Sequence, residues 1–158
     1  MKKYRIEIKW ALIFVGMMLL WMLMERLLGF HDAHIDKHAI VTNLIAIPAI
    51  AIYVFALLDK RKNFYDGFMS YKQGFISGLI ITLIVTLFTP LIQYITSTVI
   101  TPDYFSNIIE YTVNEGMMER EDAEAYFNLK SYMIQATIGA PIMGLLTTAV
   151  VAFFTKKK

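Results

Sequence analysis

Long stretches without charge are the feature of this chain that most restricts its fold. Three of them contain no charged residue: residues 39–58, 73–99 and 131–155. A fourth, residues 10–30, is free of charge up to Met24 and then contains Glu25 and Arg26. An α-helix needs about 20 mostly apolar residues to cross the hydrocarbon core of a bilayer. We therefore predict an all-α integral membrane protein with four transmembrane helices, at residues 10–30, 39–58, 73–97 and 131–155.

Composition supports the same class, because 57% of the residues are hydrophobic, whereas soluble domains usually contain about 45–50%. The chain has no cysteine, which excludes disulfides and thiolate metal ligands. We expect one transmembrane domain that covers residues 1–158, with a segment at residues 100–130 outside the bilayer.

Basic residues are distributed unevenly around the four stretches. Most of the 15 lysines and arginines precede the first stretch, separate the second from the third, or follow the fourth: Lys2, Lys3, Arg5, Lys9, Lys60, Arg61, Lys62, Lys72, Lys156, Lys157 and Lys158. Loops rich in lysine and arginine remain in the cytoplasm. We therefore expect both termini and the central connection to be cytoplasmic. Contacts with lipid headgroups are expected for the basic residues of that connection, Lys60, Arg61, Lys62 and Lys72.

Small residues recur every four positions in the third and fourth predicted helices. The two rows are Ser70, Gly74, Gly78, Thr82 and Thr86, and Ala136, Ala140, Gly144, Thr148 and Ala152. In lipid, small residues allow helix backbones to approach closely. We predict close packing through Gly74, Gly78, Ala140 and Gly144, either between these two helices or between copies of the chain.

All three histidines, His31, His34 and His38, lie in the connection between the first two predicted helices. If this connection were helical, His31 and His38 would share one face, with His34 about 60° away. Such a spacing can hold zinc or copper. A plain polar connection would have a similar length. No metal or other cofactor is expected, and the histidines stay as candidate ligands. Glu25 is interpreted as an interfacial pair with Arg26, with proton or cation coupling as the alternative.

The segment at residues 100–130 begins with Thr101, Pro102 and Asp103, a pattern typical of a helix start. A second short helix is expected from Met118, and the segment is rich in acidic residues. We predict short amphipathic helices on the outer surface between the third and fourth transmembrane helices. They either rest on the membrane or form a cap that binds a cation or a partner.

One motif resembles a known family. In the stretch "DGFMSYKQGFISG" the resemblance depends on Gly67, Phe68, Ser70, Tyr71, Gln73, Gly74, Phe75 and Gly78. This stretch resembles the small bacterial membrane proteins grouped as domain of unknown function 4199. The resemblance implies a four-helix, multi-pass protein of the bacterial inner membrane, and it supplies no catalytic residues.

Motifs for metalloproteases, nucleophile elbows and Walker loops are missing from the sequence, so we expect neither an enzyme nor a nucleic-acid-binding protein. The favoured hypothesis is a structural or accessory protein of the lipid bilayer, acting through helix packing, as a homo-oligomer or with a membrane protein partner. One alternative is a small oligomeric transporter or channel with a path that reaches Asn43, Gln93 or Gln135. Another is a metal or pH sensor at the outer surface.

Overall fold

The computed structural model describes residues 4–157, which form two compact units. Unit 1 is built from Met1–Met17, Ala46–Phe88 and Ile138–Lys158, as far as these ranges are described, and unit 2 from Met18–Ile45 and Thr89–Thr137. Three of the basic residues predicted to be cytoplasmic, Lys2, Lys3 and Lys158, lie outside the described residues.

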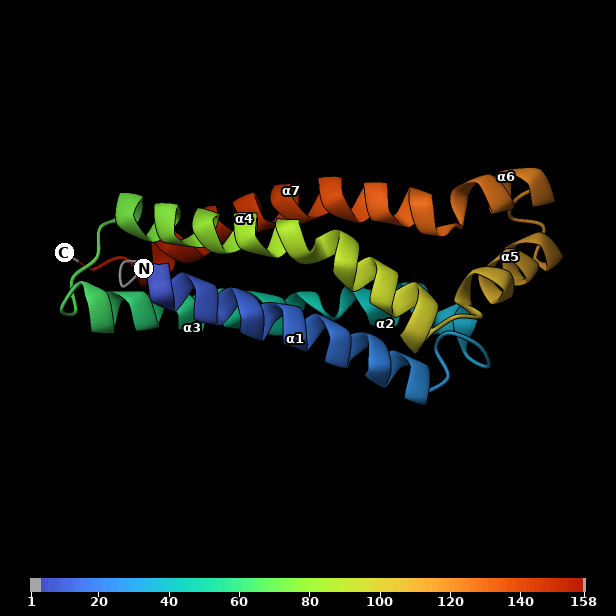
Figure 1. The fold of residues 1–158 in the computed structure, drawn as a ribbon, viewed down its shortest axis with the longest axis horizontal. Helices are drawn as coiled ribbons and strands as arrows, with labels where there is room; N and C mark the ends of the chain where they lie inside the picture. Colours follow the sequence, from blue (N-terminus) through green and yellow to red (C-terminus); the bar gives the residue numbers. More distant parts are fainter. Residues whose placement is uncertain (1–3, 158) are drawn as a thin grey trace. The chain divides into compact units, whose positions relative to one another are not determined.

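The described chain consists of helices and short connections (Figure 1). In chain order these are α1 (Arg5–Leu27), α2 (Ile35–Asn43), α3 (Ala46–Phe64), α4 (Tyr71–Ile95), a π-helical turn η2 (Thr96–Ile100), α5 (Tyr104–Asn114), α6 (Arg120–Tyr126) and α7 (Leu129–Thr155). Within residues 4–157, four helical segments are long and apolar enough to cross a membrane: Arg5–Leu27, Ile35–Phe64, Tyr71–Ile100 and Leu129–Thr155. The prediction of an all-helical chain with four apolar helices of membrane length is confirmed.

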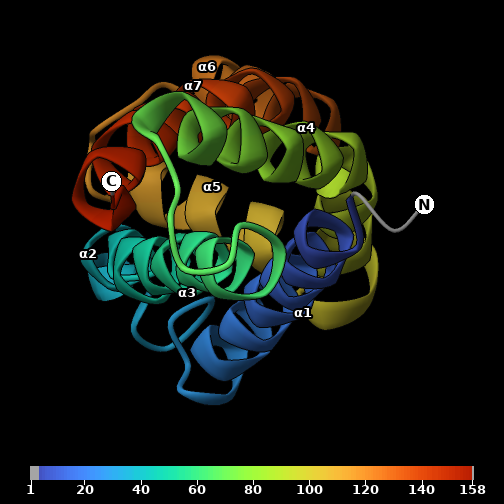
Figure 2. The ribbon, with the colours of Figure 1, turned by 90° about the vertical axis from the view of Figure 1, so that its left-hand side faces the viewer.

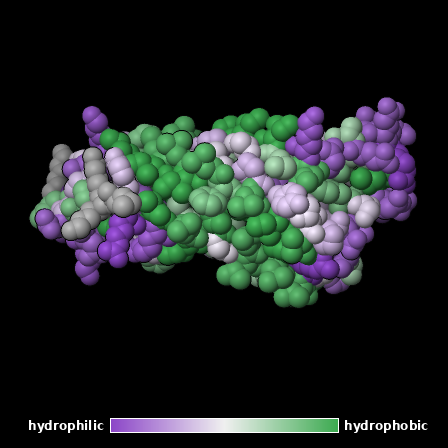
Figure 3. All heavy atoms as spheres, viewed as in Figure 1, coloured by the Kyte–Doolittle hydropathy of each residue, from purple (hydrophilic) through white to green (hydrophobic). Residues whose placement is uncertain are grey.

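The surfaces of the long helices carry large apolar side chains. Leu87, Phe154 and Leu27 are 79%, 78% and 76% exposed. Hydrophobic residues, in green, cover much of the visible face of these helices, whereas hydrophilic residues concentrate around the α5–α6 segment and near the α3–α4 connection (Figure 3). Soluble monomers rarely expose apolar patches larger than a few hundred Å², so this surface suits contact with lipid chains.

Helix α1 begins at Arg5, earlier than the predicted start at Trp10, and the charged residues Glu7 and Lys9 have partners inside unit 1. The carboxylate of Glu7 lies 2.8 Å from the Lys60 ammonium and accepts a hydrogen bond from Ser77 Oγ. Lys9 forms an ion pair with Asp59. The predicted helix left these residues out because they are charged, but an ion pair can be accommodated among packed membrane helices.

The second membrane-length segment is interrupted between α2 and α3. A proline crowds the carbonyl four residues before it, and for Pro48 that residue is Leu44. Here the backbone hydrogen bonds join residues three apart instead of four, from Leu44 N to Val41 O (3.0 Å) and from Ile45 N to Thr42 O (3.3 Å). Pro48 then lies in the first turn of α3, where its missing N–H costs nothing. The prolines in the other two long helices, Pro90 and Pro141, stay inside α4 and α7.

In unit 1, helices α4 and α7 contact each other through their small residues. A Cβ added at Gly78 would lie 2.5 Å from the Thr148 side chain, and one added at Gly144 would lie 2.4 Å from the Thr82 side chain. Gly74 faces Ala152 in the same way, at 3.4 Å. These glycines are therefore in contact within one chain. Ala140, which also belongs to the predicted row, lies in α7 and is partly exposed.

The start of α4 and the end of α7 lie at the same end of unit 1, beside the connection from α3 (Figure 2). Met69 and Lys157 exchange backbone hydrogen bonds of 2.9 Å in both directions, and Arg61 donates to the Thr155 carbonyl. Among the predicted headgroup contacts, Lys62 and Lys72 are exposed, but Lys60 is only 3% exposed and points to Glu7. Its position differs from the expected one because the buried carboxylate attracts its ammonium group.

In unit 2, α5 and α6 lie side by side (Figure 1). Helix α5 buries Tyr104, Ile108 and Thr112 on one face, as its helical spacing requires. The exposed Arg120 guanidinium, 3.0 Å from Glu110, lowers the pKa of that carboxyl and links the two helices. An exposed ion pair of this kind contributes little to stability, so the buried face of α5 is what fixes it in the unit.

Candidate metal centre

One carboxylate and two imidazoles meet inside unit 2. Glu25 Oε2 lies 3.1 Å from His31 Nε2 and 3.6 Å from His38 Nε2. One ligand atom from each of the three residues lies within 4.8 Å of the other two. Glu25 is fully buried, His31 is 5% exposed, and the His38 side chain is 15% exposed. Side chains of these types bind transition metals when they converge in this way.

The turn after α1 places His31 next to Glu25. Gly29 has a φ of +78°, a left-handed conformation that glycine adopts without a steric penalty. Phe30 N donates to Glu25 O and Gly29 N donates to Arg26 O, both at 3.0 Å. This is the Schellman arrangement that ends many helices. It reverses the chain directly after the carboxylate, so His31 folds back onto the last turn of α1.

His38 reaches the same carboxylate from α2. Its ring centroid lies 5.0 Å from that of His31. His34 immediately precedes α2, where it is exposed and takes no part in the group. The structure therefore joins two of the three candidate histidines with Glu25. The arrangement of the three on a single helix does not occur, because residues 28–34 form turns.

Trp21 fixes the carboxylate from one turn earlier in α1. Its indole Nε1 donates to Glu25 Oε1 at 2.7 Å. Residues four apart in a helix lie on the same face, so the indole and the carboxylate point in the same direction. This bond engages one carboxylate oxygen and leaves Oε2 directed toward the histidines.

Two residues at the start of α5 support the histidines. The Tyr104 hydroxyl lies 3.3 Å from His38 Nδ1 and 3.4 Å from the Tyr132 hydroxyl. Asn107 Nδ2 donates to the His31 carbonyl at 3.0 Å. Burial raises the pKa of Tyr104, which keeps its phenol protonated. If a metal binds Nε2 of His38, the Nδ1–H group can donate to the Tyr104 oxygen, which is the usual support for a metal-bound imidazole.

The interpretation of Glu25 and Arg26 as an interfacial pair is wrong. Adjacent residues in a helix point about 100° apart, so the carboxylate faces inward while Arg26 is exposed. The Arg26 guanidinium instead donates to the carbonyl of Ile100, at the end of η2. Glu25 is left with the histidines and Trp21 as its polar partners.

Two of the distances between the candidate ligand atoms are close to those around a small metal ion. With zinc bonds of about 2.0–2.1 Å, neighbouring ligands in a tetrahedron lie roughly 3.3–3.4 Å apart. The distances from Glu25 Oε2 to the two Nε2 atoms, 3.1 and 3.6 Å, lie on either side of this value. Glu25 Oε2 and each of the two Nε2 atoms are therefore spaced much as two ligands of one metal ion would be.

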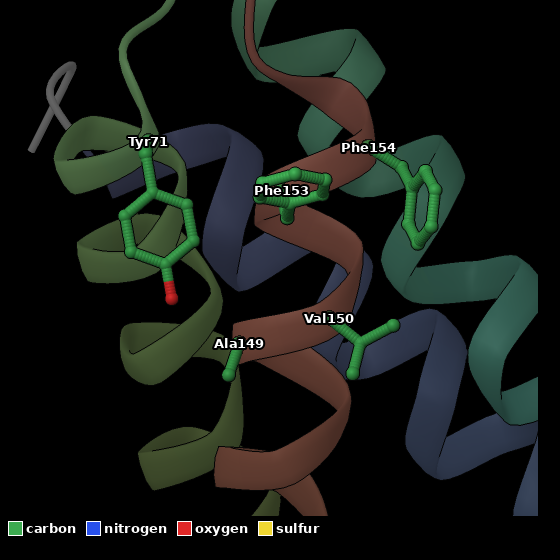
Figure 4. A pocket seen from close by; sticks show the side chains of 5 residues that line it. All are labelled: Tyr71, Ala149, Val150, Phe153 and Phe154. Carbon is green, nitrogen blue, oxygen red and sulfur yellow. The ribbon is translucent and has the colours of Figure 1, made fainter.

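Unit 1 has a shallow apolar depression on its surface. It is lined by Tyr71, Ala149, Val150, Phe153 and Phe154 (Figure 4). None of these five residues is charged, and Tyr71 supplies the only side-chain hydroxyl among them. The depression offers a surface to a lipid chain and no group for chemistry.

Sequence reasoning missed Trp21, Tyr104 and Asn107. The i, i+4 spacing of Trp21 and Glu25 was a usable signal, because it places both side chains on one helix face. The α5 residues are far along the chain from the histidines, and no spacing rule connects them. Gly29 was the further signal, since a glycine directly after a helix predicts the reversal that brings His31 back.

By their length and composition, the four apolar helical segments indicate a multi-pass membrane protein. Residues 9–157 match the family model described as "Protein of unknown function (DUF4199)", so the chain belongs to this family. The resemblance seen in the sequence is confirmed over nearly the whole chain. Comparison with curated proteins and with solved structures found no match.

Proposed function

We propose that this protein is a membrane-embedded receptor for a transition-metal dication, which binds through Glu25, His31 and His38. The observation that carries the proposal is the convergence of these three buried groups on one point within unit 2. Burial of a carboxylate beside two imidazoles is costly in a membrane protein unless the groups are paired or bind an ion. Metal binding gives this arrangement a purpose that helix packing does not require.

The ligand set favours zinc or a similar ion. Imidazole nitrogens suit zinc, copper and nickel, whereas magnesium and calcium are bound mainly by oxygen. Two histidines with one glutamate is a set that zinc accepts. Zinc is therefore the ion we assign to the site, acting as the signal in a metal sensor.

An accessory role through small-residue helix faces has less support. Gly74, Gly78 and Gly144 contact the neighbouring helix of the same chain, so these faces are already covered. A transporter or channel would need an open polar path, and Gln93 of α4 donates a hydrogen bond to Ser97 in the adjoining turn η2. The buried group of Glu25, His31 and His38 is the feature that these alternatives leave unexplained.

The test is zinc binding by the full chain in lipid nanodiscs, measured by isothermal titration calorimetry and by elemental analysis. The wild-type protein should bind one zinc ion. The variants His31→Ala and His38→Ala should each lower the affinity by more than about 100-fold, the upper range for loss of an outer-shell partner. Each variant removes one of three ligand atoms, and two cannot hold the ion tightly.

The matched control is His34→Ala, which removes a histidine from the same connection without touching the group. Its zinc affinity should equal that of the wild-type protein. Equal losses in all three histidine variants would indicate nonspecific binding by the connection. Wild-type protein that binds no zinc above background would contradict the proposed function.

We propose further that both termini and the α3–α4 connection are in the cytoplasm of a bacterial cell, and that the metal centre lies near the outer surface of the inner membrane. The basic residues Lys62, Lys72, Lys156 and Lys157 support this orientation. Glu25 lies in the last turn of α1, so a helix that starts inside delivers it to the outer side.

The orientation can be tested directly because the chain has no native cysteine. A membrane-impermeant maleimide applied to intact spheroplasts should label the variant His34→Cys. The variant Lys62→Cys should be labelled only after the membrane is permeabilised. Both positions are exposed in the structure, but in the proposed orientation they lie on opposite sides of the membrane. The reverse pattern would show that the chain has the opposite orientation.

A further inference from the structure

We infer that the metal ion bound by Glu25, His31 and His38 takes a small monovalent anion from water as its fourth ligand. This inference rests on the proposed function and extends it from the metal to a second, exchangeable ligand. It follows from the number of ligand atoms, from the charge of the group, and from the positions of the neighbouring polar side chains.

The ligand count leaves one position open. Among residues 4–157, the group that can hold a metal contains only Glu25, His31 and His38. Zinc sites are usually four-coordinate, and sites with three protein ligands hold water or another small molecule in the fourth position. No further histidine, cysteine, aspartate or glutamate of residues 4–157 belongs to the group, so the fourth position is open to a ligand from outside the chain.

The charge of the site favours an anion in that position. A dication bound by one carboxylate and two neutral imidazoles carries a net charge of about +1. Glu25 and His31 are buried, and a buried charge without compensation is strongly unfavourable. The other acids of the connection, Asp32 and Asp36, are exposed and do not belong to the group. One monovalent anion would make the site neutral.

The neighbouring polar side chains, Trp21 and Tyr104, contact other atoms of the ligand residues than those that face the metal position. Trp21 Nε1 donates to Glu25 Oε1, and indole nitrogen is only a donor. The Tyr104 hydroxyl lies next to Nδ1 of His38, whereas it is Nε2 of that ring that faces Glu25. Tyr104 thus supports the ligand from behind. The partly exposed side chain of His38 marks the side from which an anion can enter.

The test uses cobalt(II) in place of zinc, because the visible absorption of cobalt depends on its ligands and geometry. Full-length protein in nanodiscs is loaded with cobalt in a buffer without halide and titrated with sodium azide. We expect an intense four-coordinate spectrum that shifts on azide addition and saturates at one azide per cobalt. The control His34→Ala should give the same shift.

The variant Glu25→Gln provides a second readout. Glutamine keeps an oxygen ligand but removes its charge, so the loaded site would carry about +2. At saturating cobalt we expect this variant to bind azide at least tenfold more tightly than the wild-type protein, although its affinity for cobalt falls. A purely structural role of Glu25 would not strengthen anion binding.

The outcomes separate the two proposals. If cobalt does not bind to the wild-type protein, the proposed function fails. If cobalt binds with a four-coordinate spectrum that azide leaves unchanged in both proteins, the metal site stands and the anion inference is overturned. A four-coordinate spectrum that is lost in Tyr104→Phe would also overturn the inference, because it would identify the phenol as the fourth ligand.

Discussion

Replacement of Lys60 by methionine should lower the free energy of unfolding by about 3–5 kcal/mol, the usual cost of leaving one member of a buried ion pair without its partner. The Lys60 ammonium lies 2.8 Å from Glu7 Oε1, and the two side chains are 3% and 1% exposed. The second oxygen of Glu7 is also buried, without a hydrogen-bond partner among the described residues. Without Lys60, the carboxylate would keep the hydrogen bond from Ser77 Oγ but lose its ion pair.

Reversible unfolding in mixed micelles would measure the change. The control is Lys62→Met, because Lys62 is exposed on the same helix and surface changes usually alter stability by about 0.5 kcal/mol or less. The double variant Glu7→Gln with Lys60→Met should recover most of the loss, since it removes both charges. Equal stability of Lys60→Met and Lys62→Met would show that the pair is not buried in the membrane-bound protein.

Replacement of Gly78 by alanine should destabilise unit 1 by about 1–3 kcal/mol through overpacking. The new Cβ would lie 2.5 Å from Thr148 Cγ2 and 2.7 Å from its Oγ1. Thr148 is fully buried, so its side chain has no free space to enter, and α4 would have to separate from α7. The free energy of unfolding, measured as for Lys60, reports the effect.

Two further variants make this prediction specific. Gly139→Ala, also in a long helix, places its Cβ where no atom lies within 4 Å and should stabilise the protein by about 0.5–1 kcal/mol. Thr148→Ala should rescue Gly78→Ala, because it removes the clashing atoms, and within residues 4–157 the Thr148 hydroxyl has no hydrogen-bond partner to lose. Destabilisation by Gly139→Ala as well would point to a general intolerance of alanine in these helices.

The helices of this fold could be predicted well from the sequence, because a bilayer requires long apolar stretches and the chain contains four. The ends of the helices could not be predicted in this way. Glu7 and Lys9 lie inside α1 because of ion pairs with Lys60 and Asp59, and both pairings join residues far apart in the chain. The break before Pro48 depends on whether neighbouring groups can replace the lost backbone bond, which a hydropathy pattern does not report.

The candidate site was predictable in part. The histidines stood out because all three are close together in the sequence, and His31 and His38 do belong to the group. Glu25 was considered with Arg26 because the two are adjacent in the sequence, but their side chains point in different directions from the helix. Tyr104 could not be assigned, because its contact with His38 depends on how α5 packs within unit 2.

The turn at Gly29 brings the three proposed metal ligands together within a short part of the chain. It allows all three ligands to come from residues 25–38, and closing so short a loop costs little chain entropy. The supporting groups Tyr104 and Asn107 belong to α5 and are synthesised much later. If this group holds a metal ion as proposed, a nascent chain would be able to bind the ion before the α5 side chains that support its ligands are made.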